Sequence, residues 1–238
     1  MKKSRIVGVI GGMGPEATVD FMAKVIAFTS AEIDQDHVHM LVDHNPKIPS
    51  RHAALFSDGE DPAPVICAMA ARLEVSGADF LVMPCNFAHM FQEQVVAATN
   101  IPLISIIDET VAEVTRRYPD VDSVGILAAE GCVHSGTYQA ALKKKSLSAV
   151  MQTRGEQEKL MTLINAIKAG ERTAQIEIDM RELAETLAKR GAQLIVAACT
   201  ELPLVLDETM LSVPLVLSTD VLARRTISLA QGDSPLPV

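Results

Sequence analysis

Two cysteines in this chain stand where an apolar run ends, a position at which a thiol can act as an acid/base group, a nucleophile or a metal ligand. In FLVMPCNFAH (residues 80–89), Cys85 follows an apolar run and a proline, with Asn86 and His89 close behind it. In LIVAACTELP, Cys199 follows a similar run. A cysteine pKa of about 8.5 lies near neutrality, so a thiol can give or take a proton. Taken singly, either cysteine could also be a buried structural residue.

The segments around the two cysteines repeat. GADFLVMPCNFAH from Gly77 aligns with GAQLIVAACTELP from Gly191 at an offset of 114 residues. IPLISIID from Ile101 matches VPLVLSTD at an offset of 112, and VGVIGG from Val7 pairs with VGILAA at 117. Three matches in the same order indicate two related halves. Each half carries one cysteine just past the carboxyl end of an equivalent strand.

Short apolar runs alternate with longer helical patterns, which is typical of βαβ units on a parallel sheet. A first helix is expected to begin at Pro15, and another to run from Asp61 or Pro62 to Ser76 with Gly77 just past its end. Two further helices are expected near residues 155–169 and 173–190. The predicted strands are residues 5–10, 38–42, 80–83, 103–106, 123–127, 194–197 and 215–217.

These elements predict an α/β fold with two similar domains, each a parallel sheet flanked by helices. The expected domains are residues 1–113 and 114–217, with a C-terminal helix over 218–238 packing on the first. Ligands of open parallel sheets bind outside the carboxyl ends of the strands. A pseudo-two-fold relation would place the active site in a cleft between the domains, with Cys85 and Cys199 entering from opposite sides.

Two facing thiols suit the inversion of a tetrahedral carbon. One group removes a proton from one face while the other returns a proton to the opposite face, and both need similar basicity. Each cysteine is expected just before a helix start, where backbone N–H groups stabilise a thiolate.

The residues around the cysteines resemble the aspartate/glutamate racemase family, whose members work without pyridoxal phosphate. The resemblance covers essentially the whole chain and is carried by GGMGP (residues 11–15), NPKIPSR (45–51), PCNFAH (84–89), IKAG (167–170) and CTE (199–201). It implies a two-domain α/β fold, a cleft active site, no cofactor, a small amino-acid substrate and a homodimer.

The resemblance also implies roles for individual residues. Cys85 and Cys199 would be the catalytic acid/base pair, and Arg51 and Lys168 would receive the distal carboxylate of an acidic substrate. Phe87 stands where the family commonly has threonine, and so does Cys132 in GILAAEGCVHSGTY. The full set of predicted substrate-binding residues is Met13, Gly14, Arg51, Asn86, Phe87, Lys168, Thr200 and Glu201. Glu201 and His89 could instead only orient their neighbours, and Cys67 and Cys132 are expected to be structural.

Composition argues against several other classes. The net charge of −9, 3% aromatic content and absence of tryptophan disfavour a nucleic-acid partner. No stretch approaches the roughly 18–20 apolar residues of a membrane span. Four widely spaced cysteines fit a reducing cytoplasm better than a disulfide framework.

Two motifs point to other kinds of site, and two alternative functions fit the sequence. A metal-binding site could be built on three nearby histidines, His37, His39 and His44. No matching cluster of cysteines or histidines completes the ligand set, so no metal is expected. GMGPEA from Gly12 satisfies a dinucleotide fingerprint, with Asp43 as a mimic of the ribose-binding acid, but leaves the paired cysteines unexplained. Related chemistry (hydantoin racemase, maleate isomerase or arylmalonate decarboxylase) and a catalytically idle ligand-binding protein remain alternatives to an aspartate/glutamate racemase.

Overall fold

The computed structural model describes residues 4–237 and divides them into two compact α/β units. Unit 1 holds residues 4–109 together with 219–237, and unit 2 holds Thr110–Ser218. One boundary falls inside α5 (Ile106–Arg117) and the other at the start of α10 (Ser218–Ala230). The chain therefore leaves unit 1, builds unit 2 and returns to unit 1 for its last helix.

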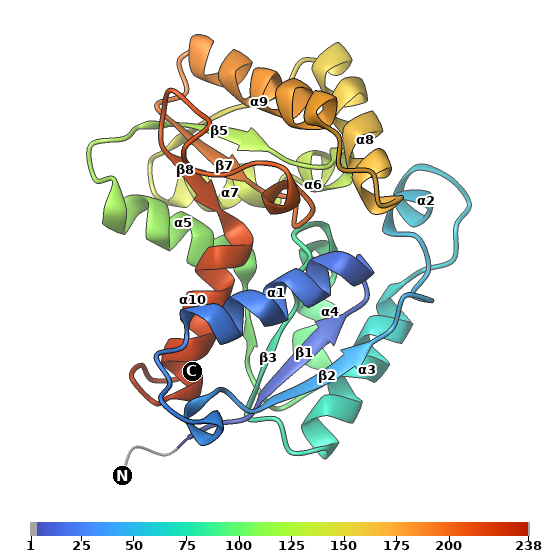
Figure 1. The fold of residues 1–238 in the computed structure, drawn as a ribbon. Helices are drawn as coiled ribbons and strands as arrows, with labels where there is room; N and C mark the ends of the chain where they lie inside the picture. Colours follow the sequence, from blue (N-terminus) through green and yellow to red (C-terminus); the bar gives the residue numbers. More distant parts are fainter. Residues whose placement is uncertain (1–3, 238) are drawn as a thin grey trace. The chain divides into compact units, whose positions relative to one another are not determined.

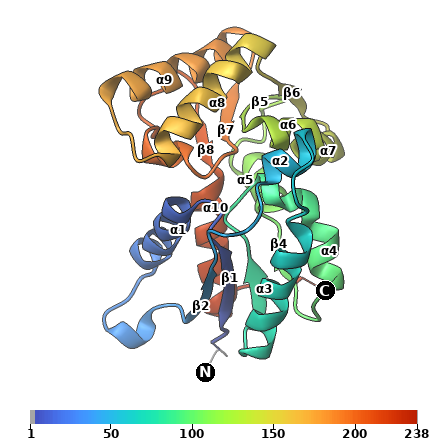
Figure 2. The same cartoon turned by 90° about the vertical axis from the view of Figure 1, so that its right-hand side faces the viewer.

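Unit 1 is built on a four-stranded parallel sheet in the order β2-β1-β3-β4. Helices α1 and α3 lie on opposite faces of this sheet (Figures 1 and 2). The strands are β1 (Val7–Gly11), β2 (Met40–His44), β3 (Phe80–Val82) and β4 (Leu103–Ile104). The helices are α1 (Pro15–Phe28), α2 (Arg51–Phe56), α3 (Ala63–Val75) and α4 (Gln92–Ala97), with 3₁₀ turns η1 (Asp34–Asp36) and η2 (Phe87–Phe91).

Unit 2 has a sheet of the same kind in the order β6-β5-β7-β8, again fully parallel. Helices α8 and α9 cover one face and α7 the other (Figure 2). The strands are β5 (Ser123–Leu127), β6 (Ser148–Val150), β7 (Leu194–Ala197) and β8 (Leu215–Leu217). The helices are α6 (Glu130–Ser135), α7 (Thr137–Lys144), α8 (Arg154–Lys168) and α9 (Ala174–Lys189), with the 3₁₀ turn η3 (Leu202–Leu204).

The central strand of each sheet carries a glycine against which a helix packs closely. A Cβ on Gly8 would come within 3.1 Å of Leu73 in α3, and one on Gly125 within 3.1 Å of Leu187 in α9. The repeat pairs Leu73 with Leu187 at the offset of 114, and it pairs the closest neighbours on the adjacent strands, Leu81 and Ile195, in the same way. The predicted α/β fold of two parallel sheets flanked by helices is confirmed, and the matching packing is consistent with the internal repeat.

Several predicted boundaries need correction. The strand predicted over residues 38–42 begins two residues later, and the one predicted over 103–106 ends at Ile104 because α5 starts at Ile106. Strand β6 was missed altogether. It is a three-residue edge strand in which Ser148 is exposed and the other two residues are half-buried, so it shows no apolar run.

Helix α10 is fastened to unit 1 by contacts at both of its ends. Lys24 of α1 pairs with Asp220 at 2.8 Å, and Arg225 pairs with Glu109 at 3.0 Å. The Arg5 guanidinium donates to the carbonyl of Leu229 at 2.6 Å. The helix ends at Ala230, so the predicted range of 218–238 is too long; the following residues form a turn, and Val238 lies outside the described residues.

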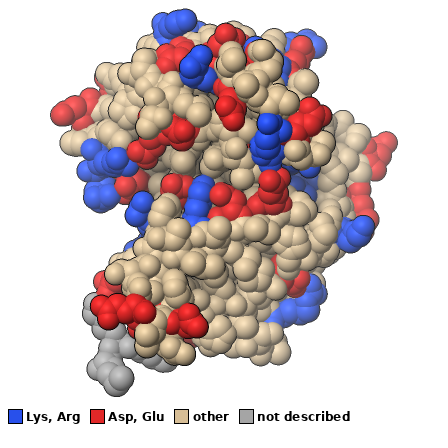
Figure 3. Space-filling model, in the orientation of Figure 1, with Lys and Arg blue, Asp and Glu red and all other residues tan. Residues whose placement is uncertain are grey.

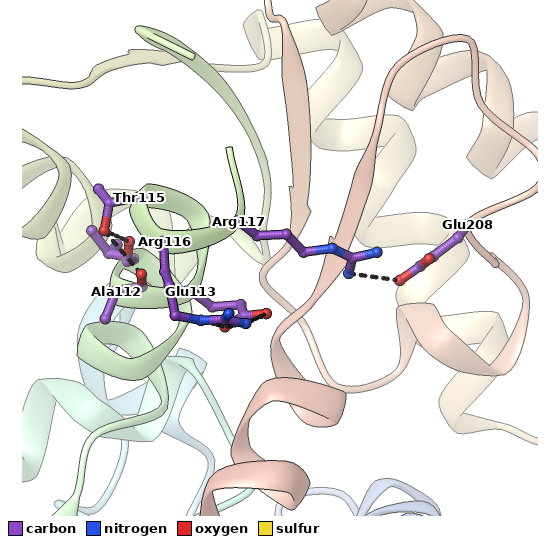
Figure 4. A network of polar contacts seen from close by, with 7 residues as sticks. Ala112, Glu113, Thr115, Arg116, Arg117 and Glu208 are labelled. Carbon is purple, nitrogen blue, oxygen red and sulfur yellow. Dashed lines mark hydrogen bonds and ion pairs between the residues drawn. The ribbon is translucent and has the colours of Figure 1, made fainter. Parts of the chain in front are cut away.

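The C-terminal end of α5 lies in unit 2 and carries a small surface network, drawn in Figure 4. Arg116 forms an ion pair with Glu113 one turn earlier in the helix, and Arg117 extends towards Glu208 at 3.7 Å. The Arg117–Glu208 pair is about half exposed, so it contributes at most about 1 kcal/mol. The Arg117–Glu208 contact nevertheless ties the end of α5 to the segment that follows η3.

The turn between β1 and α1 depends on Gly12. Its φ of +97° lies in the left-handed region, and a Cβ there would overlap the backbone carbonyl of Asn45, in the loop after β2. The Thr18 hydroxyl accepts from the Gly12 N–H at 2.9 Å and donates to the Gly14 carbonyl at 3.0 Å. Glycine therefore lets the loops after β1 and β2 approach closely.

Among residues 4–237, no helix is both long and apolar enough to cross a membrane.

Replacing Gly12 by alanine is expected to destabilise the fold. Gly12→Ala should lower the free energy of unfolding by at least about 2 kcal/mol, because it adds both strain and a backbone clash. Urea denaturation followed by circular dichroism measures the change. Gly155→Ala is the matched control, because Gly155 lies in α8 with open space around it and should be neutral or stabilising by up to about 1 kcal/mol. Equal stability of Gly12→Ala and wild type would contradict the role given to this glycine.

Candidate active site

The carboxyl edge of the unit 1 sheet gathers most of the residues predicted for the site. Met13 and Gly14 follow β1, Arg51 lies in the segment after β2, and Cys85 comes shortly after β3. Because β1 lies between β2 and β3 in a parallel sheet, all three strands end at the same edge. These residues therefore lie at one edge of the unit 1 sheet.

Cys85 is buried and its turn is held by His89. The thiol-bearing residue is only 6% exposed, and its carbonyl accepts a hydrogen bond from His89 Nδ1 at 2.9 Å. The other ring nitrogen, Nε2, accepts from the backbone N–H of Ile106 at 3.2 Å. A ring that donates from one nitrogen and accepts at the other is a neutral imidazole. Burial lowers the pKa of His89 to about 4, which favours the same state.

His89 therefore acts as a structural clamp. Both of its ring nitrogens are engaged by backbone groups, so neither is available to carry a proton to a substrate. The clamp joins the Cys85 turn to the first residue of α5. Of the two roles considered for His89, the geometry favours orientation of its neighbours.

The residues after Cys85 differ in polarity. Asn86 is 2% exposed, while Phe87 is half-buried and packs against the apolar cluster that includes Cys85 and Met83. Phe87 thus extends the core of unit 1 up to the thiol. A hydroxyl at this position would have offered a polar contact that the ring does not provide.

Arg51 is the first residue of α2, a short helix capped by Ser50. Its Nε is buried and has no hydrogen-bond acceptor among residues 4–237. A buried N–H without an acceptor is costly, so a carboxylate brought to this guanidinium would be bound favourably.

Cys199 belongs to a short polar chain in unit 2. The thiol, 7% exposed, donates to Glu201 Oε2 at 3.0 Å. The other oxygen of that carboxylate lies 3.6 Å from the ammonium of Lys168, the last residue of α8. Burial, followed by the charge of Glu201, raises the pKa of the Cys199 thiol well above its usual value, while Lys168 opposes the shift. Thr200 is buried beside them.

The expectation that a helix begins right after each cysteine needs correction. Cys85 is followed by the five-residue 3₁₀ turn η2, and Cys199 by the three-residue turn η3. So short a turn offers few aligned N–H groups, and its dipole is small. At Cys199 the surroundings favour the thiol rather than the thiolate.

Tyr138 is a polar neighbour of Cys199 that sequence reasoning missed. It is fully buried in α7, and its hydroxyl is hydrogen-bonded to the side chains of Thr110 and Ser218. Burial raises the pKa of this hydroxyl above its usual value. A signal was present: the offset of 117 that pairs β1 with β5 also pairs Tyr138 with the buried Phe21. The repeat indicates a buried ring there, and the extra hydroxyl indicates a buried polar partner.

The other cysteines and the histidines add no further site. Cys132 is buried in α6 and Cys67 is half-buried in α3, and all four cysteines are free thiols. Within residues 4–237, no group of three or more His, Cys, Asp or Glu side chains is arranged to hold a metal ion.

Comparison with known proteins gives one consistent result. A family model described as Asp/Glu/Hydantoin racemase matches residues 10–226. The chain is 30% identical over 227 residues to the broad specificity amino-acid racemase RacX of Bacillus subtilis, covering 94% of this chain and 97% of that relative.

Solved structures agree with this result. The aspartate racemase of Picrophilus torridus has 31% identity and a TM-score of 0.83, with 98% of this chain and 96% of that chain covered. An aspartate racemase homologue from Pyrococcus horikoshii has 25% identity and a TM-score of 0.77, with 97% and 99% covered.

The buried His89 is expected to make stability fall in mild acid. Its folded pKa of about 4 lies below the 6.5 of a solvent-exposed imidazole, so its contribution is complete above pH 6.5 and is lost as the pH falls towards 4. The total loss is about 3 kcal/mol of unfolding free energy. Urea titrations at pH values from 7.5 to 4 give the unfolding free energy at each pH. This free energy should change less steeply with pH in His89→Gln than in wild type, by up to about 1.4 kcal/mol per pH unit.

The control for this titration is His52→Gln. His52 is exposed in α2, so this variant should keep the wild-type slope. Identical slopes for wild type and His89→Gln would show that the ring is not held neutral by the fold.

Proposed function

Because the chain belongs to the Asp/Glu/Hydantoin racemase family, we propose that it is an amino-acid racemase that works without a cofactor and uses Cys85 and Cys199 as its acid/base pair. Amino-acid racemases are isomerases. The observation that carries the proposal is the repeat, which gives each sheet one buried cysteine in the turn at the carboxyl end of an equivalent strand. One thiolate would remove the α-proton, and the other thiol would protonate the opposite face.

We further propose that the substrate has an acidic side chain. Arg51 presents a buried Nε that has no acceptor in the part of the chain that the structure describes, which favours an incoming carboxylate. Lys168 would be a second cation for the same group. Its ion-pair distance to Glu201 of 3.6 Å is longer than a hydrogen bond, and its side chain is 41% exposed. The aspartate racemase of Picrophilus torridus supports this class, whereas the name of the Bacillus relative allows a wider one.

The amino-acid head would be held by the remaining residues of the predicted site. The backbone of Met13 and Gly14 would face the carboxylate or amine, because Thr18 fixes this loop through hydrogen bonds to Gly12 and Gly14. Asn86 and Thr200 would contribute polar side chains beside the two cysteines, and both are buried there. Phe87 would limit the space near Cys85 and thereby influence which side chains fit.

Assembly and location are also proposed. The four free cysteines favour a reducing cytoplasm. A homodimer is supported by the outer face of α1, which exposes Val19 by 60% and Ile26 by 51%, with Ile33 exposed by 60% shortly after the helix. These three residues, called the α1 face here, belong to unit 1, whose surface in Figure 3 includes a broad uncharged area. A second copy of the chain is the occupant proposed for this face.

Exchange of the α-proton tests the proposed reaction. Incubation with aspartate or glutamate in D₂O should remove the α-proton NMR signal, and Cys85→Ser and Cys199→Ser should each slow this loss by at least about 100-fold. Cys67→Ser is the control and should behave as wild type. Exchange that survives in both site variants would refute the cysteine assignment. A lack of exchange with any amino acid, together with turnover of a hydantoin or an arylmalonate, would favour the alternative chemistry.

Charge placed on the α1 face should split the proposed dimer. Light scattering after size-exclusion chromatography should give a dimer mass for wild type and a monomer mass for the double variant Val19→Glu, Ile26→Glu, because each carboxylate would have to be buried at the interface. Val75→Glu is the control, since Val75 is 89% exposed at the end of α3 and should leave the mass unchanged. A monomeric wild-type protein would contradict the proposal.

A further inference from the structure

The two halves differ in the residue that comes two positions after each cysteine. At the offset of 114, Glu201 occupies the place that Phe87 occupies after Cys85. Phe87 contributes an apolar ring to the unit 1 core, whereas Glu201 accepts a hydrogen bond from the Cys199 thiol at 3.0 Å. The repeat therefore gives the two turns the same backbone position but gives only the second one a carboxylate there.

The carboxylate is held where it acts strongly on the sulfur. The Glu201 side chain is 5% exposed, so water screens its charge little. The ammonium of Lys168 lies 3.6 Å away on the other side of the carboxylate and partly offsets it. Tyr138 of α7 is another titratable neighbour of Cys199; burial raises its pKa, so it stays neutral and adds no charge.

We propose that Glu201 is a positioning residue that keeps Cys199 protonated in the ligand-free protein and so makes it the proton donor of the pair. This inference rests on the racemase function proposed above. A thiol that donates to a carboxylate is stabilised as a thiol, because ionisation would place two negative charges about a hydrogen bond apart. Lys168 limits this stabilisation, since its positive charge favours the thiolate.

The proton balance of a turnover follows from this assignment. In the resting form Cys85 acts as the base and takes the α-proton, breaking the C–H bond and leaving the electron pair on carbon. Cys199 then gives its own proton to the opposite face, so the pair ends with a thiol at Cys85 and a thiolate at Cys199. The resting form is thus ready for the enantiomer whose C–H bond faces Cys85, and it is restored when Cys199 takes a proton from water and Cys85 gives one up. The other enantiomer reacts with the form in which Cys199 is the thiolate and Cys85 the thiol.

Site-resolved alkylation tests the assignment without relying on racemase activity. The full-length protein is treated with iodoacetamide from pH 6 to 11, and mass spectrometry of the Cys199 peptide gives the pH midpoint of its reaction. Glu201→Gln keeps the size of the side chain and removes its charge, so the midpoint should fall by about 1 pH unit or more. Lys168→Met removes the opposing charge, so the midpoint should rise. The matched controls, Glu158→Gln and Lys143→Met, change exposed side chains and should leave it unchanged.

The opposite signs of the two shifts distinguish this role from a merely structural one. A midpoint that is unchanged or higher in folded Glu201→Gln would overturn the proposal. If that variant does not fold, Lys168→Met decides: a higher midpoint supports the proposal and an unchanged or lower one overturns it. The result is separate from the α-proton assay, which alone decides whether the protein is a racemase.

Discussion

A parallel sheet sends all of its strand ends to one edge, and this constraint places the residues proposed for the site in each unit. In unit 1 the strands that end at the site belong to a sheet whose central strand allows close helix packing at Gly8. In unit 2, Gly125 performs the same task on β5. A larger side chain at either glycine would push the covering helix outward. The position of each cysteine thus depends on a contact within the core beneath it.

The same backbone turn is secured differently in the two halves. In unit 1 the carbonyl of Cys85 accepts a hydrogen bond from the ring of His89, which also accepts from the start of α5. In unit 2 the carbonyl of Cys199 accepts from the backbone N–H of Leu202 at 3.1 Å. A side-chain clamp in one half and a backbone bond in the other leave both turns with their carbonyls satisfied. The repeat therefore preserved the placement of the thiols while their surroundings diverged.

The sequence was most informative where one pattern repeats. The matched segments around Cys85 and Cys199 predicted two related sheets and the strand end at which each thiol lies, because burial on both faces forces continuous apolar runs. The sequence did not predict β6, because its exposed and half-buried residues form no apolar run. It also left the roles of His89 and Glu201 open. Those roles depend on which atoms meet after folding, and no local pattern records that His89 reaches the N–H of Ile106.

The energetics of Glu201 favour a functional reason for its presence. A buried carboxylate costs several kcal/mol to remove from water, and its contacts with one thiol and one ammonium at 3.6 Å recover only part of that cost. Phe87 shows that the equivalent position in the other half accepts an apolar side chain within a packed core. Stability alone would therefore favour an apolar residue at both positions. A carboxylate kept beside a thiol, against that preference, changes the protonation of the sulfur, which is the property on which proton transfer at carbon depends.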